Sequence, residues 1–292
     1  MSQPRLGFIG IGLMGKPMTL RLLAAGYKVA VWNRSKEKLA PVTAKGAVAK
    51  DSPAEVARFA DIVMMCVTDQ NSVKDVLFGA GGVVEAAAEG KIVIDFSSIA
   101  PKAAQEYAAR LEQKNVGYID APVSGGTVGA EQGTLAVMAG GRPEHIEFVR
   151  PLVAELASRF TRMGGPGAGQ VTKLTNQVIV ASLFPVIAEA LRLAEAAGVD
   201  AARVPEALSG GFADSRPLQV FGPRMASRQY EPALGTVNVM LKDLLNAVAV
   251  AEEAGVPLPM ARGAVVRFRL LVGEGKGEAE PSAFIDLLAG GR

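Results

Sequence analysis

Hydrophobic and polar positions divide the chain into two parts with different patterns. Up to about residue 163, short apolar runs alternate with segments whose apolar positions recur at helical spacing. The apolar runs predict strands at 5–9, 27–32, 62–67, 91–96, 118–119, 134–139 and 159–163. Helices that connect β-branched apolar runs are typical of a mostly parallel sheet with helices on its faces.

From Gly164 onward, strand signals nearly vanish, and alanine, leucine and helical periodicity prevail. Helices are predicted at 168–197, 201–209, 216–227, 238–254, 259–273 and 281–289. We therefore predict an α/β protein with a Rossmann-type, doubly wound, mostly parallel sheet in residues 1–163. An all-α domain for substrate binding and dimerisation follows in residues 164–292 and begins with a long interdomain helix.

A glycine turn follows the first predicted strand directly and leads into a helix. The turn is GIGLMG at 10–15, so Leu13 and Met14 lie between its second and third glycines. Gly10, Gly12 and Gly15 suit a tight turn, close approach of the backbone to a pyrophosphate and close packing of helix on strand. A simple strand-to-helix turn is the alternative. The context of strand, glycines and helix favours a dinucleotide site.

The end of the second strand indicates which dinucleotide binds. The NAD form of this motif has an Asp or Glu near this point to hold the ribose 2′-hydroxyl, whereas here the chain reads Asn33-Arg34-Ser35, with Lys38 close behind. A guanidinium offers a planar fork of donors to a 2′-phosphate, and a hydroxyl and a second cation can add to it. A solvated basic turn is the alternative. The sequence favours NADP over NAD.

Later strands end in short polar residues. Val67 ends the third strand listed above and Thr68 follows it, and Ser98 lies two residues after the fourth strand. Carboxyl ends of parallel strands meet at the same sheet edge as the glycine turn, where ligands bind in such sheets. These residues are therefore candidate cofactor neighbours, although short polar residues at strand ends also act as helix caps.

Two further features are candidates for substrate chemistry. Ser124-Gly125-Gly126 would present consecutive backbone amides and one hydroxyl, which suits a carboxylate, unless it is only a surface turn. Lys173 and Asn176 stand three residues apart near the start of the long helix, so they share one face. A solvated surface lysine is the alternative for Lys173.

Composition excludes several classes of protein. Of 292 residues, 49% are hydrophobic, and 31 basic and 29 acidic residues are interspersed, which argues against a nucleic-acid-binding protein. One cysteine and one histidine argue against a disulfide framework and a His/Cys metal site. The run Leu6–Met14 lacks a cleavage site, and the apolar run Val178–Ala188 is about half of the ~20 residues that a membrane span needs. We expect a cytoplasmic protein with no membrane partner.

Several motifs occur in order along the chain: GFIGIGLMGKPM (7–18), DFSSIAP (95–101), DAPVSGGTVGAEQGTLAVMAGG (120–141), GAGQVTKLTNQ (167–177) and LKDL (241–244). With these motifs the chain resembles the β-hydroxyacid dehydrogenase family over essentially its full length. Within the family, GAGQVTKLTNQVIVA and ALSGGFADSR are most similar to 2-hydroxy-3-oxopropionate (tartronate semialdehyde) reductases. Other members oxidise 3-hydroxyisobutyrate or reduce succinic semialdehyde and glyoxylate.

The resemblance implies a role for each candidate. Lys173 matches the catalytic lysine and Asn176 its companion, and residues 124–126 match the substrate-anchoring turn. Lys242 and Asp243 match a pair from the helical domain that closes over cofactor and substrate. The implied reaction is hydride transfer between NADP(H) and a small 3-hydroxyacid, β-oxoacid or semialdehyde, with Lys173 as proton donor or acceptor.

Three departures from the pattern of similar reductases bear on the ligands. Many tartronate semialdehyde reductases end the second strand differently from Asn-Arg-Ser. Residues 232–240 lack the Phe and the basic or His residues expected in a carboxylate pocket, and Glu280-Pro281-Ser282 stands where similar reductases tend to have Asp-His-Ser. An oxo-phosphonate substrate is thus an alternative, as is a non-catalytic NADP-binding or scaffold protein.

The apolar helical half predicts a homodimer or homotetramer.

Overall fold

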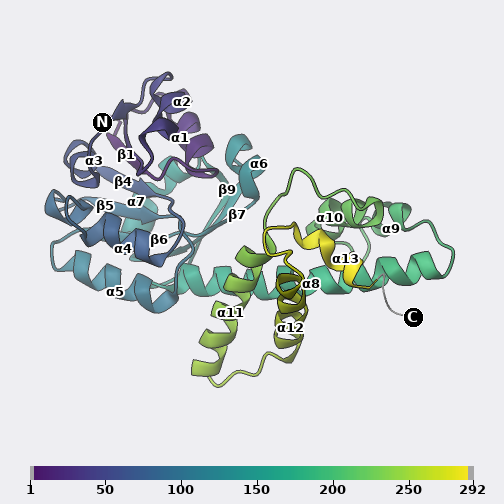
Figure 1. Ribbon diagram of the computed structural model, residues 1–292. Helices are drawn as coiled ribbons and strands as arrows, with labels where there is room; N and C mark the ends of the chain where they lie inside the picture. The colour runs from purple at the N-terminus through teal and green to yellow at the C-terminus, as the bar shows by residue number, and fades with distance from the viewer. Residues whose placement is uncertain (1–2, 289–292) are drawn as a thin grey trace. The chain divides into compact units, whose positions relative to one another are not determined.

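The computed structural model describes residues 3–288, and the chain forms two compact units (Figure 1). One unit extends to Lys173 and the other begins at Leu174. The sequence predicts the boundary between residues 163 and 164, ten residues before the boundary in the structure. The two differ because the first turns of helix α8 (Ala168–Ala196) belong to the first unit. The assignment of one domain to cofactor and the other to substrate and dimerisation stays a prediction.

The first unit contains a sheet with the strand order of a doubly wound fold. Its order is β3-β2-β1-β4-β5-β6-β8-β7, with β9 beside β8. Strands β1 to β6 are parallel, whereas β8 is antiparallel to β6 and β7. The order reverses at β1, which pairs with both β2 and β4, and such a point opens a crevice at the carboxyl ends of the strands. The strands are β1 Leu6–Ile9, β2 Val29–Trp32, β3 Val48–Ala49, β4 Ile62–Met65, β5 Ile92–Asp95, β6 Gly117–Asp120, β7 Val123–Ser124, β8 Leu135–Gly140 and β9 Ala157–Gly164.

Helices cover both faces of this sheet (Figure 1). Phe8 faces α1 and α7, while its neighbour Ile9 faces α3, α4 and α5. Because both faces are buried, the strands read as continuous apolar runs rather than alternating ones. The predicted doubly wound sheet is thereby confirmed. The elements are α1 Gly15–Ala24, η1 Lys36–Leu39, α2 Ala40–Thr43, α3 Pro53–Phe59, α4 Gln70–Phe78, η2 Val83–Glu85, α5 Pro101–Glu112, α6 Gly126–Gln132 and α7 Pro143–Val153.

The regular elements in the described residues of the second unit are all helices, as predicted. Ser215 and Thr236 cap α10 and α11 by accepting bonds from the backbone N–H of Leu218 (3.2 Å) and Val239 (3.4 Å). Side chains such as Phe184, Phe268 and Phe284 form its core. The prediction of a helix at 281–289 extends one residue beyond the described range. After α8 come η3 Ala201–Arg203, α9 Val204–Leu208, α10 Arg216–Ser227, α11 Val237–Glu253, α12 Pro259–Gly273, η4 Pro281–Ala283 and α13 Phe284–Leu287.

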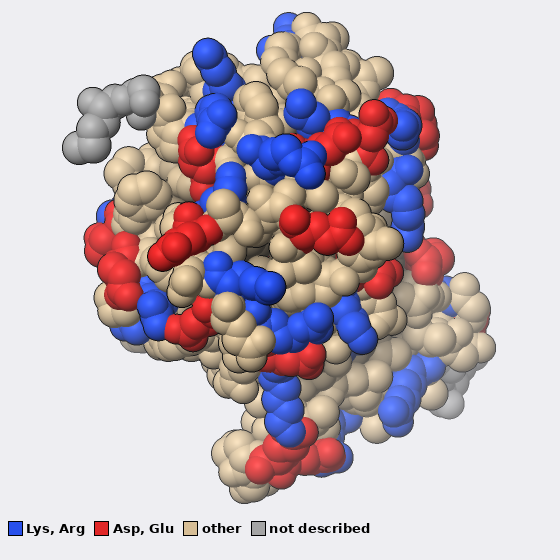
Figure 2. Space-filling view, turned by 90° about the vertical axis from the view of Figure 1, so that its left-hand side faces the viewer, with Lys and Arg blue, Asp and Glu red and all other residues tan. Residues whose placement is uncertain are grey.

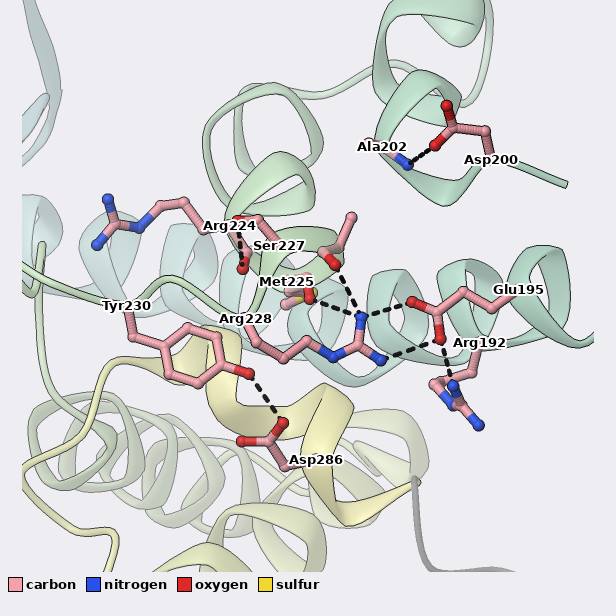
Figure 3. Close-up of polar contacts among 11 residues, drawn as sticks. Arg192, Glu195, Asp200, Ala202, Arg224, Met225, Ser227, Arg228, Tyr230 and Asp286 are labelled. Carbon is pink, nitrogen blue, oxygen red and sulfur yellow. Dashed lines mark hydrogen bonds and ion pairs between the residues drawn. The ribbon is translucent and has the colours of Figure 1, made fainter.

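An arginine joins the ends of two helices in this unit (Figure 3). Arg228 ends α10 in the left-handed conformation with φ 55°, and both of its Nη atoms donate to the carboxylate of Glu195 in α8. The bond from Arg228, together with one from Arg192, lowers the pKa of Glu195 to about 2. Nearby, the hydroxyl of Tyr230 donates to Asp286 of α13 at 2.9 Å. These contacts fix the ends of α8, α10 and α13 to one another.

Helix α8 alone among the described helices is long and apolar enough to cross a membrane, by length and composition. The core helix of a protein outside the membrane passes the same test, so one such helix is weak evidence. Ala181, Phe184 and Leu191 of α8 are buried in the core of the helical unit. The absence of a membrane partner stays a prediction.

Candidate functional site

Of the three glycines in the turn, only Gly12 has open space where a side chain would begin. Gly10 has φ +93°, and a Cβ there would lie 2.2 Å from the carbonyl oxygen of Cys66. A Cβ on Gly15 would lie 1.9 Å from the carbonyl oxygen of Gly10, whereas one on Gly12 meets nothing within 4 Å. Gly10 and Gly15 therefore satisfy the packing of the turn, and Gly12 leaves open space beside the start of α1. The turn fits a bound pyrophosphate, with Leu13 exposed beside it.

Asn33 connects the glycine turn to the end of β2. Its Oδ1 accepts a bond from the backbone N–H of Ile11 at 2.9 Å, and its Nδ2 donates to the carbonyl of Ser35 at 2.9 Å. Arg34 between them is exposed, and its guanidinium makes no hydrogen bond or ion pair with any residue between 3 and 288. Lys38 is also exposed. The donors of Arg34 are thus available to a ligand beside the glycine turn.

The ends of β4 and β5 are joined by a serine that the sequence analysis did not single out. Ser97 is buried, and its Oγ accepts a bond from the backbone N–H of Val67 at 2.9 Å. The neighbouring Ser98 is half-buried, and Thr68 is exposed. Because β2, β1, β4 and β5 are adjacent and parallel, the structure brings the predicted cofactor residues of the first unit to one edge of the sheet, whereas Lys242 lies in the second unit.

The Ser-Gly-Gly stretch is the end of a strand followed at once by a helix. Ser124 belongs to β7 and pairs with Ala136 of β8, and α6 begins at Gly126. Gly125 has φ 131° and Gly126 has φ 62°, conformations that favour glycine. Both glycines are exposed and Ser124 is half-buried. The amides and hydroxyl that are predicted to bind an acid group therefore lie at the surface of the first unit.

The first turn of α8 is hydrogen-bonded to the same part of the sheet. Asp120, at the end of β6, accepts bonds from the backbone N–H groups of Gly167 (2.7 Å) and Gln170 (2.9 Å). The side chain of Gln170 in turn bonds to the chain just after β5. Lys173 follows three residues later in the same helix and is half-buried. The sequence analysis identified Lys173 but neither Asp120 nor Gln170 as individual site residues.

Burial changes the acid–base properties of two carboxyl groups near α8. Desolvation raises the pKa of Asp95 to about 6 and that of Asp120 to about 7, against hydrogen bonds that lower both. The hydroxyl of Tyr118 donates to Asp95 at 2.9 Å. Burial also raises the pKa of the Cys66 thiol to about 12, so this thiol stays neutral.

In the second unit, Asn176 and Asp243 are linked through a glutamine. Asn176 Nδ2 donates to Gln177 Oε1 at 2.8 Å, and Gln177 Nε2 donates to Asp243 Oδ2 at 2.9 Å. Asp243 is buried and also pairs with the half-exposed Lys242, at 3.3 Å. Asp243 therefore holds both Lys242 and Gln177. Gln177 was missed as a site residue, although it directly follows Asn176 in the sequence.

Two of the departures from the family pattern are in contact with each other. Glu280 is buried and accepts bonds from Arg224 Nε (2.7 Å), the backbone N–H of Leu234 (2.9 Å) and Ser282 Oγ (2.7 Å). It thereby fixes the segment 232–236 that precedes α11. Glu280 therefore holds the segment that precedes α11 through its bond to Leu234, and both residues belong to the helical unit.

Charged groups do not point to a metal or to a polyanion. Within residues 3–288, no group of three or more His, Cys, Asp or Glu side chains is placed to hold a metal ion. Figure 2 shows Lys and Arg side chains interspersed with Asp and Glu over the face that it draws. The strand order, the glycine turn and the open space at Gly12 instead define a dinucleotide-binding protein of the Rossmann class.

Comparisons with known proteins narrow this class to a family. The family model for the NAD binding domain of 6-phosphogluconate dehydrogenase matches residues 5–165. The model for the NAD-binding of NADP-dependent 3-hydroxyisobutyrate dehydrogenase matches residues 167–288. The chain is 38% identical to 2-hydroxy-3-oxopropionate reductase of Escherichia coli, over 97% of each chain. The chain belongs to the β-hydroxyacid dehydrogenase family, and it is an NAD(P)-dependent hydroxyacid dehydrogenase.

Solved structures of similar proteins share the fold. The 3-hydroxyisobutyrate dehydrogenase of Mycobacterium tuberculosis with L-serine matches with a TM-score of 0.89 at 27% identity, covering 98% of this chain and 99% of the other. Psf3 in complex with NADP+ and 2-OPP matches with a TM-score of 0.87 at 27% identity, covering 97% and 99%. Both matches cover nearly all of this chain, so they include both units. The Rossmann-like unit followed by a helical unit is confirmed as the fold class.

Proposed function

We propose that the protein transfers a hydride between NADP(H) and a small 3-hydroxyacid, with its β-oxoacid or semialdehyde as the partner compound. One observation carries the proposal. The first turn of α8, which leads to Lys173, is hydrogen-bonded to the ends of β5 and β6 at the edge that holds the glycine turn. This anchoring supports a catalytic role for Lys173, because Rossmann units bind their cofactor at this edge of the sheet.

Proton transfer is the part of the reaction assigned to the protein. When bound, the nicotinamide supplies the hydride to the carbonyl carbon or takes it back. Lys173, as an ammonium, donates a hydrogen bond and then a proton from Nζ to the carbonyl oxygen, and as a neutral amine it removes that proton in the reverse direction. Asn176 orients the lysine or binds the same oxygen.

Other residues hold the substrate and the cofactor. The Ser124 hydroxyl and the amides of Gly125 and Gly126 bind the acid group of the substrate, because exposed amides at positive-φ glycines make an anion-binding concavity. Lys242, held by Asp243, adds a positive charge for cofactor or substrate. Fixing both ends of a small substrate orients its carbonyl toward one nicotinamide face.

NADP is the proposed cofactor in preference to NAD. The chain has no acidic residue at the end of β2, and the exposed guanidinium of Arg34 makes no hydrogen bond or ion pair with another described residue. Ser35 and Lys38 lie close to it in sequence and add a hydroxyl and a cation. The similar Psf3 was solved with NADP+, which supports the same choice.

The first substrate to test is 2-hydroxy-3-oxopropionate, because the Escherichia coli relative is named for its reduction. 3-Hydroxyisobutyrate follows from the Mycobacterium tuberculosis relative. Succinic semialdehyde, glyoxylate and an oxo-phosphonate complete the panel, the last because of the altered segment 232–240. We place the enzyme in the cytoplasm.

A homodimer or homotetramer is proposed from one face of α8. Ile179, Val186 and Leu193 recur every seven residues and are 59%, 52% and 72% exposed. Seven-residue spacing places them in one stripe along the helix. Light scattering that gives the mass of a single 30.3 kDa chain at micromolar concentration would contradict this assembly.

The reaction is tested by following NADPH oxidation at ~340 nm with the substrate panel and with a lysine variant. Lys173→Ala should lower kcat about 10²–10⁴-fold with unchanged NADPH affinity, because general acid catalysis is worth that much. Lys114→Ala, at an exposed lysine of the same unit, is the matched control and should retain full activity. Near-normal turnover by Lys173→Ala refutes the assignment. NADPH binding without turnover on any substrate would instead favour a non-catalytic NADP-binding protein.

A further inference from the structure

A cluster of buried polar side chains surrounds the first turn of α8. Asp95, Ser97, Asp120 and Gln170 are each at most 2% exposed. Buried polar groups are costly unless they are hydrogen-bonded, and every one of these side chains has a partner. All four lie in the first unit, as does Lys173. The cluster can therefore influence the position of Lys173.

Asp120 caps the start of α8. The first N–H groups of a helix have no partner within the helix, and the two oxygens of Asp120 accept from Gly167 and Gln170. Glycines make this close approach possible. A Cβ on Gly140 would lie 2.4 Å from Asp120 Oδ1, and one on Gly169 would lie 2.8 Å from Oδ2. The carboxyl group of Asp120 is thus closely surrounded by backbone at two positions where any residue with a Cβ would collide with it.

Gln170 fastens the same turn to the chain after β5. Its Nε2 donates to the carbonyl of Ser97 at 2.8 Å, and its Oε1 accepts from the backbone N–H of Ile99 at 3.1 Å. Asp95 holds the other side of this loop, because its Oδ1 accepts from the backbone N–H of Ser97 at 2.8 Å. Two opposite bonds from one amide fix both the distance and the rotation of the helix turn.

Lys173 follows Gln170 by three residues, less than one turn of the helix. Because α8 is continuous from Ala168, the position of the lysine backbone is set by where the first turn is anchored. A reacting group displaced by about 1 Å can lose on the order of 10²-fold in rate. Anchors at this turn therefore bear directly on catalysis by Lys173.

We propose that Asp120 and Gln170 are positioning residues for the reaction. Together they fix the first turn of α8 against the ends of β5 and β6, and so they set where the Lys173 ammonium meets the substrate carbonyl. The inference rests on the proposed role of Lys173. It predicts that loss of either anchor lowers kcat and leaves the binding of NADPH unchanged.

The decisive variant is Gln170→Met, which keeps the length of the side chain and removes both of its bonds. We expect kcat to fall about 10- to 100-fold, with a NADPH dissociation constant close to that of the unchanged protein. Asp120→Asn keeps one acceptor and should lose less than Asp120→Ala, which keeps none. If the Asp120 variants do not fold, Gln170→Met alone decides.

Lys91→Met is the matched control for a loss of stability. Lys91 Nζ donates to the carbonyls of Ala57 (2.8 Å) and Ala60, at the opposite end of β5. This variant also loses two polar contacts to the backbone in the same unit, so its melting temperature should fall while kcat is retained. A kcat that falls equally in Lys91→Met and Gln170→Met would show a general effect of stability and overturn the inference.

Lys173→Ala measured in parallel separates the two hypotheses. If Lys173→Ala is inactive and Gln170→Met has full kcat, the positioning role fails and the function of the lysine stands. If Lys173→Ala retains turnover, the proposed function fails and the inference fails with it. If both lose kcat while Lys91→Met keeps it, both are supported.

Discussion

Alanine at each glycine of the turn after β1 should give two different outcomes. Gly10→Ala places a Cβ 2.2 Å from the Cys66 carbonyl oxygen at φ +93°, and Gly15→Ala places one 1.9 Å from the Gly10 carbonyl oxygen. Left-handed strain costs about 1–2 kcal/mol, and overpacking adds about 1–3 kcal/mol. Both variants should therefore lose stability. Gly12→Ala meets nothing within 4 Å, so its free energy of unfolding should change by less than about 0.5 kcal/mol.

Cofactor affinity should respond in the opposite way at Gly12. A methyl group in the open space prevents the pyrophosphate from approaching the backbone amides. Loss of one charge-assisted hydrogen bond costs about 1.5–3 kcal/mol, which raises the NADPH dissociation constant about 10- to 100-fold. Gly12→Ala would then be a stable protein that binds cofactor poorly.

Urea unfolding and a fluorescence titration with NADPH measure the two quantities separately. Gly46→Ala is a control for backbone strain, because Gly46 has φ +100° and a Cβ there meets nothing within 4 Å. It should lose about 1–2 kcal/mol and bind NADPH normally. If Gly12→Ala unfolds as easily as Gly10→Ala, or binds NADPH as well as the unchanged protein, the assignment of the open space to the pyrophosphate is wrong.

Three further outcomes follow from the charged groups. Burial raises the pKa of Asp120 from 3.8 to about 7, so the folded state holds a proton that the unfolded state releases, and the free energy of unfolding should fall by up to about 4 kcal/mol as pH rises through this window. A urea series that shows a rise instead would contradict this, and Asp120→Asn should show a smaller fall. Arg34→Ser should raise the KM for NADPH about 10- to 100-fold and that for NADH little, and equal effects on both would argue against a 2′-phosphate contact. Glu280→Gln should destabilise the helical unit by about 2–4 kcal/mol because it leaves the largely buried Arg224 without its ionic partner, whereas Asp61→Asn at an exposed pair should cost less than about 1 kcal/mol.

Local sequence was sufficient for most elements of the fold. The helix 216–227 follows the cap Ser215, and the helix 259–273 begins with a proline. Both starting points can therefore be predicted from the residues at the boundary itself. By contrast, α6 was missed because GTVGAEQ contains two glycines and has low helix propensity. A Cβ at Gly125 or at Gly129 would lie 3.2 Å from the side chain of Leu135 in β8, and local sequence does not indicate such a close approach.

The candidate site was predicted as far as it depends on strand ends. Arg34, Thr68 and Ser98 lie at one edge of the sheet because each follows the carboxyl end of a parallel strand. This placement does not depend on the contacts of their side chains. Ser97 was passed over although it is the buried member of its pair, because neighbouring serines look alike until burial is known. Gln170 bonds to a residue 73 positions earlier in the chain, and no periodicity indicates such a partner.

The buried cluster gives a physical reason for the motifs on which the family resemblance rests. DFSSIAP supplies Asp95 and Ser97, the long glycine-rich stretch begins with Asp120, and GAGQ supplies Gln170. These segments are far apart in the chain and meet in one hydrogen-bonded network at the start of α8. Each member is buried, so removing one leaves another polar group without a partner, and such groups cost about 1–3 kcal/mol each. The residues around the anchors are therefore constrained together, and Lys173 is constrained through them.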